Sequence, residues 1–333
     1  MATIREISIY DGNKYPLAPS KPLMKNLCSL WLLVLSIACG PPDSQPANAT
    51  VTNQEDRIAS IAKMREPLTP FFTPMTVKEG DWLESQPENG ETFEEYVRSG
   101  PTLPTPERKI IYIQPVGSFS SKQLRVIRLT GDYMRAFYNL PVVVREVRGL
   151  DRVPANMTRL QYPDNRQVRT GYFLEDLLPG LLPADAAALI CFTSYDLFPG
   201  ETWNFVFGQA SLEKRVGVWS LWRLERNGSK IAADDLFLDR TLKIAMHETG
   251  HMFSMRHCTK FECLMSGTMH LAETDRRPLD TCPECTMKIA WAMNYPPDER
   301  YDKLAAFWRV QKRPDEQTRM QEKAKAVTVA YTE

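Results

Sequence analysis

The amino-acid sequence predicts an α+β protein built on a mixed, mainly parallel sheet with helices. From Lys109 onward, short apolar segments typical of strands alternate with amphipathic segments typical of helices. Parallel strands need long crossover connections, which are usually helical, so this alternation favours a mainly parallel sheet. A long helix follows over about residues 236–253, and a small helical region occupies the C-terminal part of the chain. The 333 residues are enough for one large domain or two modest ones.

The individual elements follow in chain order. The expected strands are residues 109–115, 142–147, 188–193 and 216–224, and the expected helices between them are residues 120–139 and 167–178. The third of these strands is continuously apolar, which is typical of a strand buried on both faces. We place the fourth, which begins Val-Gly-Val-Trp-Ser-Leu, near an edge of the sheet.

The N-terminal residues contain a candidate export signal. Residues 27–38 form an apolar run that is about half as long as the ~20 residues of a membrane span. The run fits the hydrophobic part of a secretory signal, and a small residue before Cys39 is typical of a bacterial lipoprotein in which that cysteine carries the lipid. Met24 is then a candidate for the true start. The alternative is a cytoplasmic protein in which the run forms a buried helix.

Between this signal and the main domain lie two further segments. Residues 40–54 are rich in Pro, Ser, Asn and Ala, which suits a tether. Residues 55–105 predict an irregular extension with a short helix, packed on the main domain through Trp82 and Phe93, because linkers rarely hold so many aromatic residues. The alternative is a flexible linker.

Charge and residue usage narrow the function. Lys plus Arg and Asp plus Glu number 41 each, so the formal net charge is zero, whereas nucleic-acid-binding domains usually carry a basic excess. We therefore expect no nucleic-acid partner. The chain has only four histidines, and three of them fall within eleven residues. This clustering of a scarce metal ligand points to a metal site.

The long helix presents two of these histidines on one face. His247 and His251 are four residues apart, and at ~100° per residue they point away from the apolar stripe of the helix. Two imidazoles one turn apart can share a tetrahedral zinc ion. Glu248 lies between them in the H-E-x-x-H pattern, where it can reach a metal-bound water without being a ligand.

We expect His257 to be the third ligand. On a continuing helix it would lie ~9 Å beyond His251 and face away, so the chain must turn sharply after Phe253. H-E-x-x-H alone also occurs in helices with ordinary surface histidines. A third histidine at this spacing, followed by cysteines, favours the zinc site.

Four cysteines form a second candidate metal site, as two closely spaced pairs: Cys258 with Cys263, and Cys282 with Cys285. Such pairs suit a structural zinc held by four thiolates. Two short-loop disulfides are the alternative, because an exported protein leaves the reducing cytosol. Cys191 falls in a predicted buried strand, where we expect it to be inert core.

Taken together, these motifs resemble the archaemetzincins. The resemblance spans roughly residues 75–310 and rests on the H-E-x-x-H helix with His257-Cys258, on Cys263-x-Met265, and on Cys282-x-x-Cys285. Further matching segments are Tyr112-Ile113-Gln114-Pro115, Asp196-Leu197-Phe198-Pro199, Trp203-Asn204-Phe205-Val206-Phe207-Gly208 and Arg300-Tyr301. One departure is Ser254, where metzincins usually carry a glycine in a left-handed turn.

The resemblance implies a zincin/metzincin-like fold with an active-site helix, one zinc on three histidines and a second on four cysteines. It also implies that Met265 forms the methionine turn under the metal, and that residues 216–224 form the cleft rim and pair with an extended peptide. The division along the chain is then a signal region (1–39), a tether and extension (40–105), an archaemetzincin-like catalytic domain (106–312) and a charged tail (313–333).

The expected activity is that of a zinc metallopeptidase acting on a peptide or protein substrate. Glu248 takes a proton from a zinc-activated water and later delivers it to the leaving amine. The alternative is a catalytically weak, zinc-stabilised surface protein that binds peptides or proteins. We expect a monomer in the bacterial cell envelope that contacts the membrane only through a lipid on Cys39; a cytoplasmic location is the alternative.

Overall fold

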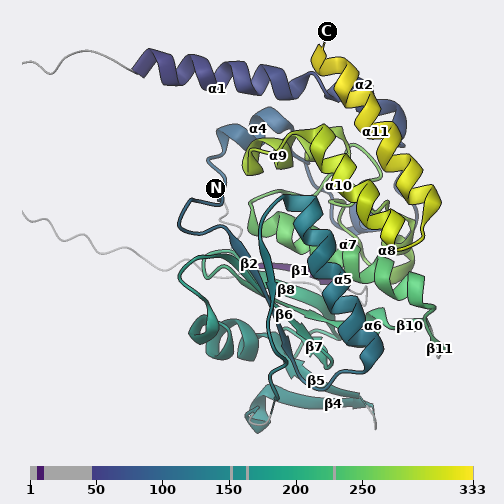
Figure 1. Cartoon of the computed structure of the whole chain (residues 1–333). Coiled ribbons are helices and arrows are strands. Elements are labelled where there is room, and N and C mark those ends of the chain that lie inside the picture. Colours follow the sequence, from purple (N-terminus) through teal and green to yellow (C-terminus); the bar gives the residue numbers. More distant parts are fainter. Residues whose placement is uncertain (1–5, 11–46, 151–152, 163–164, 228–229, 333) are drawn as a thin grey trace, which may run out of the picture.

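The structure, a computed structural model, describes residues 6–10, 47–150, 153–162, 165–227 and 230–332. The candidate start Met24, the apolar run and Cys39 lie outside these residues. In Figure 1 one twisted sheet occupies the lower half of the molecule, helices α5 and α7 lie against it, and α10 and α11 lie further out, above and to the right. Within the described part of the chain, no helix is both long and apolar enough to cross a bilayer.

The predicted mixed, mainly parallel sheet is confirmed. Four strands run parallel in the order β3 (Val142–Val144), β2 (Ile110–Val116), β6 (Ala186–Thr193) and β9 (Val216–Ser220). The sheet then continues, with changes of direction, through β8 (Val206–Ser211), β7 (Asp196–Phe198), β5 (Asn165–Arg169) and β4 (Thr158–Tyr162). Strand β1 (Glu6–Tyr10) pairs antiparallel with β8, and β10 (Arg226–Asn227) forms a separate hairpin with β11 (Lys230–Ile231).

The predicted edge position of residues 216–224 is wrong. Strand β9 lies inside the sheet, parallel to β6 and antiparallel to β8, and all of its residues are buried. Two glycines permit this, because a Cβ at Gly208 or Gly217 would lie within 3 Å of the Trp219 indole. The last part of the segment is the short helix α6 (Leu221–Leu224), which starts where the Ser220 hydroxyl accepts a hydrogen bond from Trp222 N–H.

Helix α5 (Ser121–Tyr138) confirms the helix predicted over residues 120–139. A capping box between Ser120 and Gln123 begins it, and Asn139 ends it in a left-handed conformation with φ of 53°. Helices α5 and α7 (Asp234–Met252) pack on one face of the sheet within the larger apolar core. A second apolar cluster, built around Phe173 and Leu178, covers the other face.

The helix predicted over residues 167–178 is wrong in its first part. Residues 167–169 belong to β5, and a helical turn spans only Tyr172–Leu177. The physical reason lies in long-range contacts: the Gln167 and Asn165 amides both donate to the buried Asp196 carboxylate of β7, at 2.8 and 3.0 Å. Those bonds favour an extended segment beside β7.

The N-terminal extension is ordered and helical in parts. It contains α1 (Ala47–Ala62), α2 (Arg65–Leu68), α3 (Trp82–Ser85) and α4 (Phe93–Arg98). The predicted packing through Trp82 and Phe93 is confirmed, since both side chains are buried.

The remaining helices gather at the C-terminal end: α8 (Leu271–Arg276), α9 (Pro283–Met293), α10 (Pro297–Val310) and α11 (Pro314–Thr332). The prediction of a charged C-terminal tail is therefore wrong, because α11 packs along α10 (Figure 1). Its Lys323 is buried, and the Lys323 ammonium donates to Asp280 at 2.9 Å. The composition of the segment does not show that the charged Lys323 side chain faces inward.

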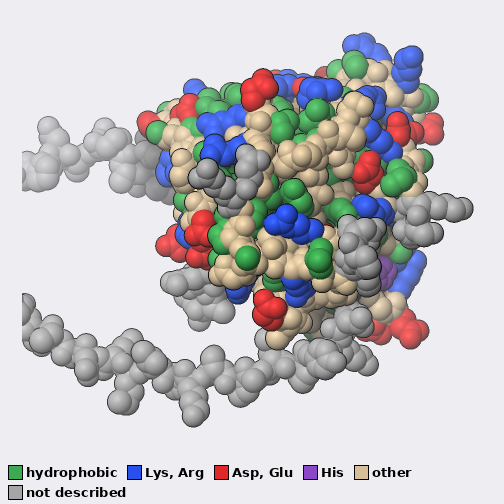
Figure 2. All heavy atoms as spheres, turned by 90° about the horizontal axis from the view of Figure 1, so that it is seen from below, with side chains coloured by type: hydrophobic (Ala, Val, Ile, Leu, Met, Phe, Trp, Pro, Cys, Tyr) green, Lys and Arg blue, Asp and Glu red, His purple; other side chains and the backbone are tan. Residues whose placement is uncertain are grey.

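Acidic and basic side chains are interspersed over the face shown in Figure 2, without an extended area of one sign. This arrangement agrees with the balanced composition, which has 41 residues of each sign.

Candidate metal centre

Helix α7 carries the H-E-x-x-H motif in the position predicted for it. His247, Glu248 and His251 are all buried, with at most 3% of each residue exposed. The helix packs against α5, where the Tyr138 hydroxyl donates to Met246 O at 2.6 Å. This bond ties α5 to the residue directly before the motif.

The chain turns sharply after α7, as predicted. Ser254 has φ of 65° in the left-handed region, and Met255 N–H donates back to Gly250 O at 3.1 Å. This is the closing bond of a left-handed helix end. The turn reverses the chain and brings His257 back beside the two helical histidines.

The three imidazoles converge through their Nε2 atoms. The ring centroids of His247, His251 and His257 lie 4.5 to 5.2 Å apart, and one nitrogen from each lies within a single 4.8 Å group. Each Nδ1 faces an acceptor: Leu264 O at 2.9 Å, Met255 O at 2.6 Å and a Glu88 carboxylate oxygen at 2.8 Å. Because these oxygens only accept, each Nδ1 carries the proton and each Nε2 presents a lone pair.

The arrangement fits a zinc ion. The Nε2 atoms of His247 and His251 are 2.9 Å apart, so two lone pairs face each other without a proton between them. The buried Nε2 of His257 has no hydrogen-bond partner in the described part of the chain. Burial, together with His257, lowers the pKa of His247 to about 3, so the imidazole is neutral, as metal binding requires. Tetrahedral zinc takes such nitrogens as ligands.

Glu248 stands beside these histidines without a partner. The side chain is fully buried, and neither carboxylate oxygen has a hydrogen-bond partner among the described residues. Burial raises the pKa of Glu248 to about 8. A cation held by the adjacent imidazoles would oppose this shift and restore the carboxylate. A buried carboxyl group with free oxygens next to a metal site is suited to moving a proton.

The four predicted cysteines also converge. The Sγ atoms of Cys258, Cys263, Cys282 and Cys285 form one buried group within 4.8 Å, and all four are free thiols in the structure. The backbone N–H groups of Met265 and Cys282 donate to the Cys263 sulfur at 3.4 and 3.2 Å. Four converging sulfurs that also accept backbone hydrogen bonds match a thiolate zinc site. Cys191 lies apart from them, buried in β6.

Met265 lies under the H-E-x-x-H helix. A Cβ at Gly250 would be 2.6 Å from the Met265 sulfur, so the absence of a side chain at residue 250 admits the thioether. The Met265 carbonyl accepts from Cys258 N–H at 2.8 Å. The methionine segment therefore connects the helix of the histidine site to the cysteine site.

Glu88 is a site residue that the sequence did not reveal. It lies in the extension, in the run Gln-Pro-Glu-Asn-Gly, whose composition indicates only a turn. Although burial would raise its pKa, the hydrogen bond with His257 lowers the pKa of the Glu88 carboxyl. Trp82 Nε1–H donates to the same carboxylate.

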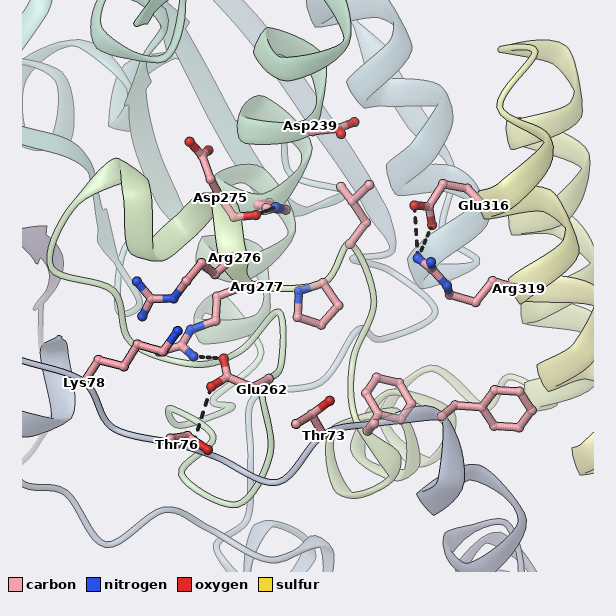
Figure 3. A pocket seen from close by; sticks show the side chains of 15 residues that line it. Thr73, Thr76, Lys78, Asp239, Glu262, Asp275, Arg276, Arg277, Glu316 and Arg319 are labelled. Carbon is pink, nitrogen blue, oxygen red and sulfur yellow. Dashed lines mark hydrogen bonds and ion pairs between the residues drawn. The ribbon is translucent and has the colours of Figure 1, made fainter. Parts of the chain in front are cut away.

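Two other features lie outside this centre. Asp81, His270 and Glu273 also form a compact group, but Arg276 and Arg277 occupy its carboxylates at 2.6 Å. A cavity of about 650 Å³ lies between the extension, α7 and α11 (Figure 3), and its lining includes none of the clustered histidines or cysteines. Acidic and basic side chains pair within it, as Glu316 and Arg319 do in Figure 3, so it favours no ligand of one charge.

The histidine site has the pattern of a zinc-dependent metallopeptidase, with H-E-x-x-H on one helix and a third histidine returned by a sharp turn. A family model described as peptidase family M54 matches residues 186–291. Archaemetzincin-2 of Mus musculus is 33% identical over 274 residues, which cover 73% of this chain and 76% of that protein. Archaemetzincin-2 of Homo sapiens is 34% identical over 280 residues, with the same coverage.

The chain belongs to the archaemetzincin family of zinc metallopeptidases. Among solved structures, an archaemetzincin from Methanopyrus kandleri is 26% identical, with a TM-score of 0.46, and the match covers 57% of this chain and 98% of that one.

Proposed function

We propose that the protein hydrolyses peptide bonds at the three-histidine site, with Glu248 as the general base. The observation that carries the proposal is the buried Glu248 carboxyl group, whose two oxygens have no hydrogen-bond partner in the described residues, beside three converging imidazoles. Such an arrangement has no evident structural purpose, because an unpaired buried carboxyl group costs stability.

The chain's own residues divide the work. His247, His251 and His257 would hold the metal through the Nε2 atoms, which converge. A zinc ion bound there supplies Lewis-acid chemistry, which polarises a peptide carbonyl and makes water easier to deprotonate. Glu248 accepts the proton from the attacking water and afterwards donates it to the leaving amine.

Glu248→Gln tests the proposal directly. The variant keeps the side-chain volume but removes the base, so kcat/KM on a peptide cleaved by the wild type should fall by at least about 10²-fold. Zinc content and thermal midpoint should match those of the wild type. A peptide library assayed with and without a chelator identifies the substrate beforehand. A fully active Glu248→Gln protein would show that another group is the base.

We also propose two zinc ions per chain and a metzincin-like site with Met265 under the first metal. The four converging thiols and the contact between Gly250 and Met265 support this. Metal analysis of gently purified protein should give a stoichiometry near two. Replacing Cys282 and Cys285 with serine should remove one ion and lower the unfolding midpoint. One ion in the wild type would contradict the proposal.

The location remains a proposal drawn from the sequence. The apolar run at 27–38 followed by Cys39 supports a lipid anchor in a bacterial cell envelope. Expressed in a bacterium, the protein should fractionate with membranes, and Cys39→Ala should reduce this. An intact mass with an unmodified N-terminus at Met1 or Met24 would refute the anchor.

A further inference from the structure

We propose that Glu88 positions His257 for the metal, so that the N-terminal extension completes the catalytic centre. The inference rests on the proposed function, because it concerns an imidazole that holds the zinc. It assigns a role to a residue outside the matched family segment, residues 186–291.

His257 differs from the other two ligands in how it is held. His247 and His251 stand on α7, and each of their Nδ1 atoms donates to a backbone carbonyl. His257 lies in a stretch without regular secondary structure between Ser254 and Phe261. The orientation of its ring therefore depends on side chains packed around it.

Glu88 supplies the missing acceptor. Its two carboxylate oxygens lie 2.8 and 3.0 Å from the Nδ1 atom of His257, whose side chain is only 9% exposed. The Glu88 side chain is 32% exposed, so the bond is partly screened by solvent but still charge-assisted. A carboxylate at Nδ1 fixes the tautomer that binds metal through Nε2 and makes the imidazole a stronger donor.

Trp82 holds both partners in place. Its Nε1–H donates to Glu88, and its ring contacts the His257 ring edge-on at a centroid distance of 5.3 Å. The indole lies against Gly267, where a Cβ would be 2.5 Å from its Cδ1 atom. The backbone N–H of Trp82 also donates to the buried Glu273 carboxylate at 3.1 Å.

The extension is fixed to the loop of His257 on both sides of Glu88. Before it, Met75 N–H donates to Lys260 O at 3.0 Å and Thr73 O accepts from Glu262 N–H at 2.9 Å. After it, the Tyr96 hydroxyl donates to Phe253 O at 2.7 Å. Glu88 is therefore the middle of a strap anchored at both ends. The boundary predicted at residue 106 separates this strap from the histidine that it supports.

The test compares zinc retention in Glu88→Ala, Glu88→Gln and the matched control Glu79→Ala, which removes an exposed carboxylate of the same segment. Full-length holoprotein is challenged with a chromophoric chelator, and His257→Ala identifies the ion held by the histidines. Glu88→Ala should weaken the binding of that ion about 10- to 100-fold, while the cysteine-bound ion should be retained as in the wild type. Glu88→Gln keeps an amide oxygen that can accept a hydrogen bond from Nδ1. The loss of zinc affinity in this variant should therefore be smaller but measurable. Glu79→Ala should match the wild type.

The outcomes separate the two proposals. If His257→Ala removes no zinc relative to the wild type, the histidines hold no metal and the proposed function itself fails. If the histidines do hold a zinc ion, but Glu88→Ala retains that ion as well as Glu79→Ala does, Glu88 has no positioning role. Should Glu88→Ala fail to fold, as judged by its thermal midpoint, Glu88→Gln decides alone, and wild-type zinc affinity in that variant overturns the inference.

Discussion

Ser254 lies in the turn that returns His257, and two of its properties affect the free energy of unfolding in opposite directions. Its φ of 65° is left-handed, which costs an L-residue roughly 1–2 kcal/mol and glycine almost nothing. Its hydroxyl accepts a hydrogen bond from Thr102 N–H at 3.0 Å, worth about 0.5–1.5 kcal/mol. Ser254→Gly removes both, so the free energy of unfolding should change by less than about 1 kcal/mol. Ser254→Ala loses the bond but keeps the strain, and should destabilise by about 0.5–1.5 kcal/mol.

Denaturant unfolding of the zinc-loaded proteins measures these differences. Ser254→Gly should be more stable than Ser254→Ala by about 1 kcal/mol, which in a thermal melt would correspond to a shift of at most about 2 °C in the midpoint of a chain of this size. Thr102→Pro removes the same N–H donor from the other side and offers an independent comparison with Ser254→Ala. A glycine variant less stable than the alanine variant would refute the reasoning, because it would show that residue 254 is not under left-handed strain in solution.

Two further predictions concern the core around the metal sites. Gly250→Ala should lower the thermal midpoint, because crowding the Met265 sulfur costs about 1–3 kcal/mol and outweighs the gain of about 1 kcal/mol in helix propensity; an unchanged midpoint would mean that the thioether moves aside freely. Although burial would raise its pKa, Lys323 and Arg300 hold the pKa of Asp280 at about 2. This depressed pKa contributes about 2 kcal/mol of stability that is present above pH 4 and lost as the pH falls toward 2, so Asp280→Asn should flatten the acid limb of a stability–pH curve.

The parts of the site that could be predicted from the sequence are those determined by short-range patterns. His247, Glu248 and His251 share one helix, so their relation follows from helical geometry alone, and the turn after Phe253 follows from the need to return His257. The cysteine pairs were likewise close in sequence. These predictions depend on residues within a few turns of one another.

The failures all involve partners that are distant in the chain. Gln167 is extended because Asp196 accepts its amide, and β9 is central because β6 and β8 pair with its two sides. Glu88 lies 169 residues before the histidine that it contacts, in a stretch whose composition marks only a turn. Periodicity cannot locate such pairings, because it records only which face of an element is apolar.

The adjacency of His257 and Cys258 has a consequence for assembly during synthesis. A chain emerging from the ribosome exposes all three histidines before Cys282 and Cys285 exist, so early zinc capture would involve a third ligand on an unanchored loop. If the four thiolates hold the second ion proposed above, Cys258 is fixed, and His257 is then held through the peptide bond that joins it to Cys258. We therefore expect ordered loading, with the cysteine site filled first; stepwise zinc addition to the metal-free protein, followed by thiolate absorbance, should reach its plateau at the first equivalent.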